Sequence, residues 1–130
     1  TSNPNSIAQK AALEALNGPK DTMELMRAEF DKRRKLMYER VSGMPYLSTL
    51  EPQGAFYLFV DGKEVLEKKY KGEKIGTMDR LADILLSDYA VAIVPCEDFG
   101  FPDSFRLSYA ISVEQIKKGL DRIEAFLKSL

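Results

Sequence analysis

Arg106 is the residue with the clearest potential for chemistry, because it stands inside a strand pattern and not in a charged surface segment. The run Phe105–Ala110 alternates with a period of two, so its apolar side chains share one face of a strand. The other face carries Arg106, Ser108 and Ala110. A guanidinium in a half-buried strand needs room and an anion, since an unpaired buried charge costs several kcal/mol. The sequence therefore predicts that this strand face forms the base of a site that binds a carboxylate or phosphate. The planar guanidinium of arginine suits a carboxylate.

A structural ion pair is the alternative role for Arg106. The arginine could lie over the edge of a sheet and pair with a nearby acid such as Glu97 or Asp98. Ion pairs of this kind are common in folded proteins, so a charged side chain is not by itself a ligand site. The strand pattern leaves both interpretations open.

The composition excludes several other kinds of catalytic site. The 130 residues include no histidine and a single cysteine, Cys96, which excludes Ser-His and Cys-His nucleophile systems and an intrachain disulfide. We interpret Cys96 as a small packed residue, and its isolation favours a reducing, cytoplasmic setting. Glu97, Asp98 and Asp103 are close in sequence but lack calcium-loop spacing, so we expect no metal site. The glycines form no phosphate-binding loop, and no lysine sits in an apolar segment that would desolvate its amine.

Charge and hydropathy narrow the possible partners. The net charge is −1 with acids and bases interspersed, and no basic patch with aromatic residues indicates nucleic acid. No run approaches the 18 apolar residues of a membrane span. The length fits one domain with a core of its own. Because the chain begins at Thr1, almost directly on a helix cap, we interpret it as part of a longer protein.

Four longer helices are predicted to position these residues. Asn3-Pro4 is a helix start, and small residues from Ala8 to Leu16 form one face. A long helix runs from Asp21 to about Ser42. The remaining two helices are expected to begin after the caps Thr77 and Ser112, the latter followed by a stripe of aliphatic residues.

The strands are predicted as two pairs. Residues 47–50 and 55–60 read as strand, type I turn and strand, and the apolar second run predicts a central strand buried on both faces. Residues 63–74 are expected to form a short helix and an exposed loop, and residues 90–94 pair with the strand of Arg106. Strands in one region with helices packed over them make the fold α+β, with a small antiparallel or mixed sheet.

Three spaced motifs together carry a resemblance to a known family. The chain resembles the C-terminal part of class I, fold-type I aminotransferases, nearest to the aspartate aminotransferase-like branch. The similarity covers essentially the whole chain in order. Its motifs are Thr1–Gln9, Pro52–Tyr57, and Val91–Pro95 with Phe99-Gly100 and Phe105–Ala110.

The resemblance implies roles for individual residues. Arg106 occupies the place of the arginine that binds the substrate's α-carboxylate, and Phe99 lies in the loop that closes on substrate. Ser2 and Asn3 match the stretch that approaches the active site of the neighbouring subunit. Residues 1–43 would be a helical lead containing the helix that connects the two domains, and residues 44–130 the α+β core of the small domain.

The same resemblance implies a cofactor and partners. Members of the family use pyridoxal 5'-phosphate, joined to a lysine of the large domain, and act as homodimers on amino acids and 2-oxo acids. That lysine has no counterpart here, so the piece alone is expected to be inactive and to need the rest of the same enzyme chain. Cys96 replaces a usual glycine, and Glu97-Asp98 place acids where neutral residues are commoner, which argues against strict aspartate specificity.

Two hypotheses from other classes stand beside this one. The chain could be a free-standing α+β regulatory domain that binds a small carboxylate or amino acid. It could also be an interaction domain that uses the small-residue helix from Ala8 to Leu16.

Overall fold

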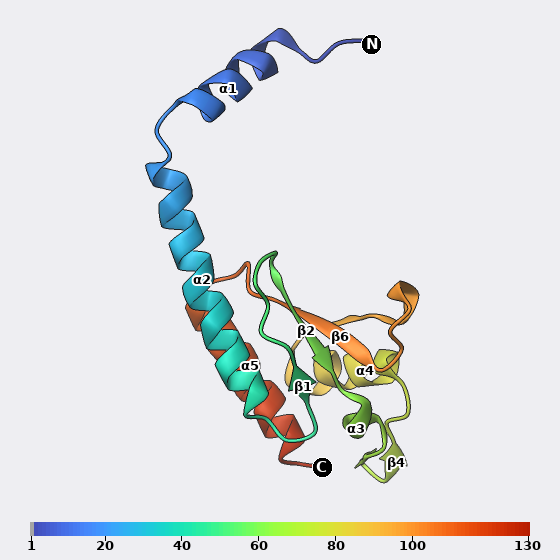
Figure 1. Ribbon diagram of the computed structural model, residues 1–130. Helices are drawn as coiled ribbons and strands as arrows, with labels where there is room; N and C mark the ends of the chain where they lie inside the picture. The colour runs from blue at the N-terminus through green and yellow to red at the C-terminus, as the bar shows by residue number, and fades with distance from the viewer. Residues whose placement is uncertain (1) are drawn as a thin grey trace.

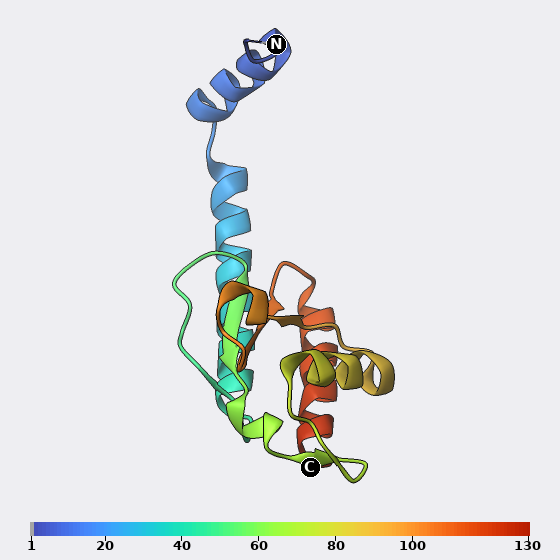
Figure 2. The same cartoon turned by 90° about the vertical axis from the view of Figure 1, so that its right-hand side faces the viewer.

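The computed structural model describes residues 2–130 as an α+β body with a helical arm (Figure 1). The arm consists of α1, Ser6–Asn17, and the N-terminal part of α2, Asp21–Ser42. It extends away from the body in both views, and the C-terminus lies at the opposite end (Figures 1 and 2). The α+β fold class is confirmed, and the long helix has the predicted bounds.

A four-stranded antiparallel sheet forms the centre of the body. Its strands are β1 (Ser48–Thr49), β2 (Tyr57–Asp61), β5 (Val94–Pro95) and β6 (Ser104–Ser108). Their order is β1-β2-β6-β5, so β6 lies between β2 and β5. The β2–β6 ladder is the longest, running from Tyr57 opposite Ser108 to Asp61 opposite Ser104. The strand that carries Arg106 is therefore paired on both sides.

The two faces of the sheet differ sharply in burial. Leu58 and Val60 of β2 and Phe105 of β6 are fully buried, and Leu107 of β6 is buried at 6% exposure. The alternate residues of β2 face the other way and are exposed. The prediction of a strand buried on both faces is thus wrong, because helices cover only one face of this sheet. The sequence of β2 is continuously apolar because two aromatic residues occupy its open face.

Helices α2, α4 (Met78–Tyr89) and α5 (Val113–Leu127) close the core over the buried sheet face. The predicted α5 stripe is confirmed at Ile116, Leu120, Ile123 and Leu127, all buried. Arg40 of α2 ties the two long helices together by pairing with Asp121 at 2.8 Å and Glu124 at 3.1 Å. Burial of this stripe, at about 25 cal/mol per Å² of apolar surface, is the main force that seats α5.

Helix caps follow the sequence in two of the predicted places. The Thr77 hydroxyl accepts from the Arg80 N–H and the Ser112 hydroxyl from the Gln115 N–H, as expected. At the first helix the cap is Asn5 and not Asn3, since the Asn5 side chain accepts from Ile7 N–H at 2.8 Å. Asp21 is the first residue of α2, as predicted, and Lys20 precedes it in the cap position without a side-chain cap hydrogen bond.

The connections between elements depart further from prediction. The β1–β2 loop spans residues 50–56, longer than a type I turn, because the strands pair Thr49 with Val60. After α3, Lys63–Leu66, the chain forms a small hairpin, β3 (Lys69–Tyr70) with β4 (Glu73–Lys74), where a loop was expected. Residues 90–93 are not strand, and only Val94–Pro95 pairs with β6.

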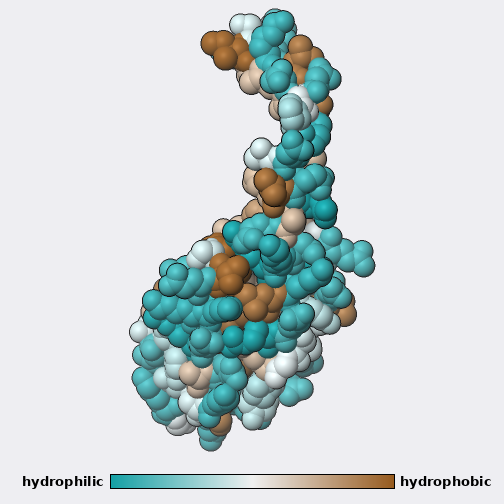
Figure 3. Space-filling view, turned by 90° about the vertical axis from the view of Figure 1, so that its left-hand side faces the viewer, coloured by the Kyte–Doolittle hydropathy of each residue, from teal (hydrophilic) through white to brown (hydrophobic). Residues whose placement is uncertain are grey.

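The arm has almost no core of its own. No residue of α1 is buried, and in α2 the buried positions are Met37 and Val41, both in the C-terminal half. Apolar side chains therefore lie exposed along the arm, and Figure 3 shows them among polar residues. They are Ile7, Leu13, Leu16, Met23, Leu25 and Met26. Among residues 2–130, no helix combines the length and apolar character that crossing a bilayer requires.

Candidate functional site

Arg106 lies at the middle of β6, on the open face of the sheet. Its neighbours across the ladders are Phe59 of β2 and Val94 of β5. The next residues along β6, Phe105 and Leu107, point into the core and fix the strand in place. The predicted alternation is confirmed, because Phe105, Leu107 and Tyr109 are buried on one face while Arg106 stands on the other.

Aromatic rings, and not carboxylates, surround the Arg106 guanidinium. Its central carbon lies 4.1 Å from the ring centre of Phe99 and 5.2 Å from that of Tyr57. Both distances are within the range of cation–π attraction. Nε of Arg106 is buried and has no hydrogen-bond partner in the described structure. An unsatisfied buried donor is unusual and points to an acceptor that the chain itself does not supply.

The alternative of a local ion pair for Arg106 does not hold in this structure. Within residues 2–130, no acidic oxygen lies within 4.0 Å of its guanidinium nitrogens, although the arginines of helix α2 are paired with acids. Glu97 and Asp98 are exposed in the loop before β6. The donors of Arg106 are therefore free for an incoming anion, and a carboxylate matches their planar fork.

The loop between β5 and β6 brings Phe99 to the arginine. Its short 3-10 helix η1, Glu97–Phe99, begins after Cys96 and ends at Gly100, whose φ of +85° favours glycine. The Cys96 N–H donates to the Ser104 carbonyl at 2.9 Å, and the Cys96 side chain is fully buried. Cys96 is a packed residue, as predicted, and anchors the base of this loop.

The structure unites two of the predicted site residues and separates the others. Phe99 contacts Arg106 directly. Ser2 and Asn3 lie before α1, at the far end of the arm from the sheet (Figure 1), and both are exposed. Their suggested role toward a neighbouring subunit stays a prediction. Within the described residues, no group of three or more His, Cys, Asp or Glu side chains could hold a metal ion.

Tyr57 is the site residue that sequence reasoning missed. It starts β2 and pairs with Ser108, which places it diagonal to Arg106 on the same sheet face. Diagonal neighbours are within reach of long side chains, so the register would have identified the contact. The continuous apolar run of residues 55–60 hides this contact, because such a run is typical of a strand buried on both faces.

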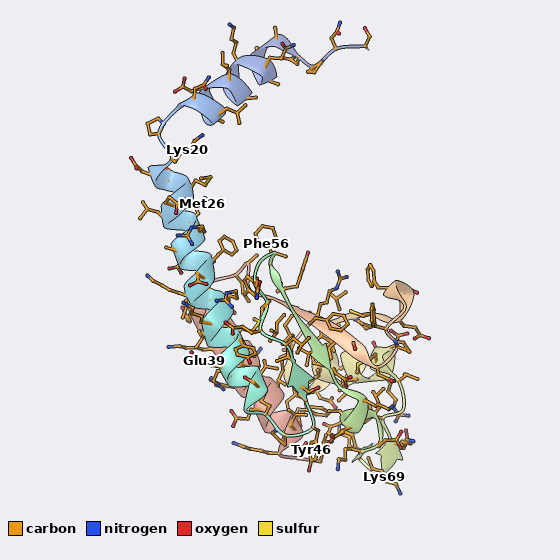
Figure 4. All side chains as sticks on the ribbon, viewed as in Figure 1. Lys20, Met26, Glu39, Tyr46, Phe56 and Lys69 are labelled. Atoms are coloured by element: carbon orange, nitrogen blue, oxygen red, sulfur yellow. The ribbon has the colours of Figure 1, made fainter. Side chains whose placement is uncertain are left out.

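A second aromatic cluster fixes the loop that precedes β2. Phe56 at the tip of this loop packs against Phe30 of α2, with ring centres 5.3 Å apart (Figure 4). The Tyr109 hydroxyl donates to the carbonyls of Gly54 at 2.9 Å and Ala55 at 3.0 Å. Burial raises the pKa of Tyr109, so the phenol stays protonated and keeps donating. A cavity of about 330 Å³ lies between this loop and α2.

A polar cluster lies between the β3–β4 hairpin and α4. Asp88 of α4 accepts from Lys71 at 2.8 Å and from the Tyr70 hydroxyl at 3.0 Å. These bonds, that from Lys71 first, lower the pKa of Asp88. Burial, with smaller contributions from Tyr89 and Asp88, raises the pKa of Tyr70 to about 12. This cluster serves the packing of the β3–β4 hairpin on α4.

An antiparallel sheet, covered by helices on one face and carrying an arginine without an acidic partner on the other, defines the structural class of the described chain. The known proteins to which the chain is similar give that class a name. A family model described as aminotransferase class I and II matches residues 1–123. The chain belongs to the class I and II aminotransferase family.

Individual relatives agree with this assignment. The aspartate aminotransferase of Bacillus sp. (strain YM-2) is 40% identical over 128 residues, which are 98% of this chain and 32% of that protein. The crystal structure of the aspartate aminotransferase from Rhizobium meliloti superposes with a TM-score of 0.93 at 39% identity, over 100% of this chain and 33% of the other. The structure of the alanine aminotransferase from Pyrococcus furiosus superposes with a TM-score of 0.85 at 31% identity, over 98% of this chain and 31% of the other. The chain spans about a third of the length of the relatives it matches.

Proposed function

We propose that the chain is the C-terminal, small-domain segment of an amino acid aminotransferase of the aspartate or aromatic type, and that Arg106 binds the α-carboxylate of its substrates. The single observation that carries the proposal is the state of Arg106. Its Nε is buried without an acceptor, and no carboxylate of the described chain pairs with it. Relatives named as aspartate aminotransferases support the reaction class.

The arginine's contribution is binding and orientation. Two parallel N–H bonds from its guanidinium would fix the carboxylate plane and so align the α-carbon for loss of its proton. Pyridoxal 5'-phosphate, the cofactor of class I aminotransferases, supplies when bound the electron sink for that proton loss. In residues 2–130 no lysine is buried, so none has the desolvated setting that would suit attachment of the cofactor. The residues of this chain fit the substrate's carboxylate, and the cofactor is proposed to be held by the remainder of the enzyme.

The partners follow from this assignment. We propose that the segment works with the rest of its own chain, in a homodimer, on amino acids and 2-oxo acids, in the cytoplasm. The exposed apolar side chains of the arm support a larger assembly, because Ile7 and Leu16 are 78% and 73% exposed without one. The same observation weighs against a free-standing regulatory domain. Glu97 and Asp98 are exposed on the loop that carries Phe99, so they would disfavour a second carboxylate on the substrate.

Substitution of the arginine in the full-length enzyme tests the proposal. Arg106→Ala should raise KM for the amino acid and lower kcat/KM by about 100-fold or more, because charge-assisted hydrogen bonds are worth about 1.5–3 kcal/mol each. Arg80→Ala is a matched control, since Arg80 is exposed and pairs with Glu73 on the surface. An unchanged kcat/KM in Arg106→Ala would overturn the assignment.

The isolated 130-residue chain gives an independent test. We expect it to be inactive in transamination and silent in calorimetric titration with aspartate or glutamate, because one side of the proposed carboxylate site is missing. Micromolar binding would favour the regulatory domain instead. Self-association of the chain at high concentration that Ala8→Glu abolishes would favour an interaction role of α1, whose residues are all exposed.

A further inference from the structure

We infer that Tyr57 is a positioning residue for Arg106, forming with Phe99 an aromatic support that holds the guanidinium without using its hydrogen-bond donors. The inference rests on the proposed function of Arg106 and adds a second residue to that site. The two rings come from different elements, Tyr57 from β2 and Phe99 from the β5–β6 loop. Both lie within cation–π distance of the same guanidinium carbon.

The kind of group beside the guanidinium decides whether Arg106 can bind a substrate carboxylate. A carboxylate neighbour would occupy the planar fork of the guanidinium and compete with a substrate carboxylate for the same N–H groups. An aromatic face attracts the cation through its π electrons and leaves those groups free. In the described structure no acidic oxygen lies within 4.0 Å of the Arg106 nitrogens, and Nε has no acceptor. The rings therefore orient the charge while keeping it available.

Tyr57 is the fixed half of this support. It belongs to the β2–β6 ladder, opposite Ser108, so its backbone is held by the same sheet that holds Arg106. Phe99 stands in an exposed loop that turns at Gly100. Only the tyrosine therefore has a position that the sheet dictates directly, and it should hold the guanidinium whether or not the loop moves.

A purely structural role does not explain Tyr57. Its side chain is 44% exposed on the open face and is not part of the hydrophobic core. No hydrogen bond of its hydroxyl occurs among the described residues. Replacement should consequently leave the free energy of unfolding nearly unchanged while disturbing Arg106, and this difference makes the inference testable.

The experiment compares Tyr57→Phe and Tyr57→Leu in the full-length enzyme. Leucine removes the ring, and we expect KM for the amino acid substrate and the calorimetric Kd for a monocarboxylate analogue such as 3-phenylpropionate to rise about tenfold, with kcat changed less and the unfolding midpoint unchanged. Phenylalanine keeps the ring and should stay within about twofold of the parent enzyme. Phe56→Leu is the matched control, because Phe56 is 52% exposed and packs on Phe30 instead of a cation.

A double-mutant cycle separates this inference from the proposed function. On an Arg106→Lys background, Tyr57→Leu should raise KM and Kd by less than about twofold, because the planar guanidinium that the ring supports is gone. If Arg106→Lys weakens binding but Tyr57→Leu does not, or if the two effects simply multiply, the positioning role is refuted and the function of Arg106 stands. If neither substitution changes KM or Kd, the proposed function itself fails.

Discussion

Removing the Tyr109 hydroxyl should lower the free energy of unfolding, because it deletes a single hydrogen-bond donor. The residue is 1% exposed, and its hydroxyl donates to two carbonyls of the loop before β2, at 2.9 and 3.0 Å. The loop needs this tie because Ala55 has a φ of +62°, a left-handed conformation that is unfavourable for alanine. Tyr109→Phe keeps the ring, which also lies 6.5 Å from Phe30, and deletes only the donor.

The size of the effect follows from the exposure of the acceptors. Gly54 and Ala55 are exposed residues, so water can reach their carbonyls once the phenol is gone. The loss is then close to that of one shared hydrogen bond, about 1 kcal/mol, and not the larger penalty of a buried orphan group. For a chain of this length that corresponds to a fall in Tm of about 4 °C.

Urea unfolding followed by far-ultraviolet circular dichroism measures the change as a lower midpoint at constant m-value. Tyr89→Phe is the control, because the Tyr89 hydroxyl, which lies 3.2 Å from Ser129 Oγ and also interacts with Tyr70, is within reach of water, so its loss should cost less than about 0.5 kcal/mol. Equal midpoints for Tyr109→Phe and Tyr89→Phe would refute the reasoning. A loss above about 3 kcal/mol would show that the carbonyls stay buried and unpaired.

Two further predictions concern packing and acid stability. Gly62→Ala should cost about 1 kcal/mol, because its new Cβ would lie 2.8 Å from Met78 Cε, whereas Gly54→Ala, which meets nothing within 4 Å, should be neutral in the same urea titration. The folded-state pKa of Asp88 is lowered, mainly by Lys71, so its carboxylate stabilises the fold above its ordinary pKa of about 4 and loses this contribution as the pH falls through the folded value. Asp88→Asn should therefore lower the urea midpoint at pH 7 and match the parent chain at pH 2, and a difference that persists unchanged at pH 2 would contradict the linkage.

The sequence was a good guide wherever one periodicity decided the outcome. The stripe of α5 and the alternation of β6 are each set by the need to bury one face, so the pattern and the structure agree. The cap at Ser112 was equally visible, because its hydroxyl accepts from the otherwise free N–H of Gln115, three residues on. The sequence also singled out Arg106, because it is the one charged residue in the alternating run of residues 105–110.

The sequence failed where partner strands or covering elements decide the outcome. A continuous apolar run like β2 is typical of a strand covered on both sides, yet Tyr57 and Phe59 are exposed. The contact between Tyr57 and Arg106 depends on the β2–β6 register, which neither strand specifies alone. The β3–β4 hairpin is only two residues long in each strand, below the length at which alternation can be seen.

Helix α2 behaves mechanically as a rod clamped at one end. Its buried residues, Met37 and Val41, lie in the C-terminal half, and the first part of the helix extends past the body (Figure 2). The helix is held by the body from Phe30 onward, where the ring packs on Phe56. From Phe30 back to Asp21 its free part is about 14 Å long at 1.5 Å per residue, so a tilt of about 5° moves its end by about 1 Å. Any tilt of the part of α2 that packs on the body would therefore reach the start of α1 as a larger displacement.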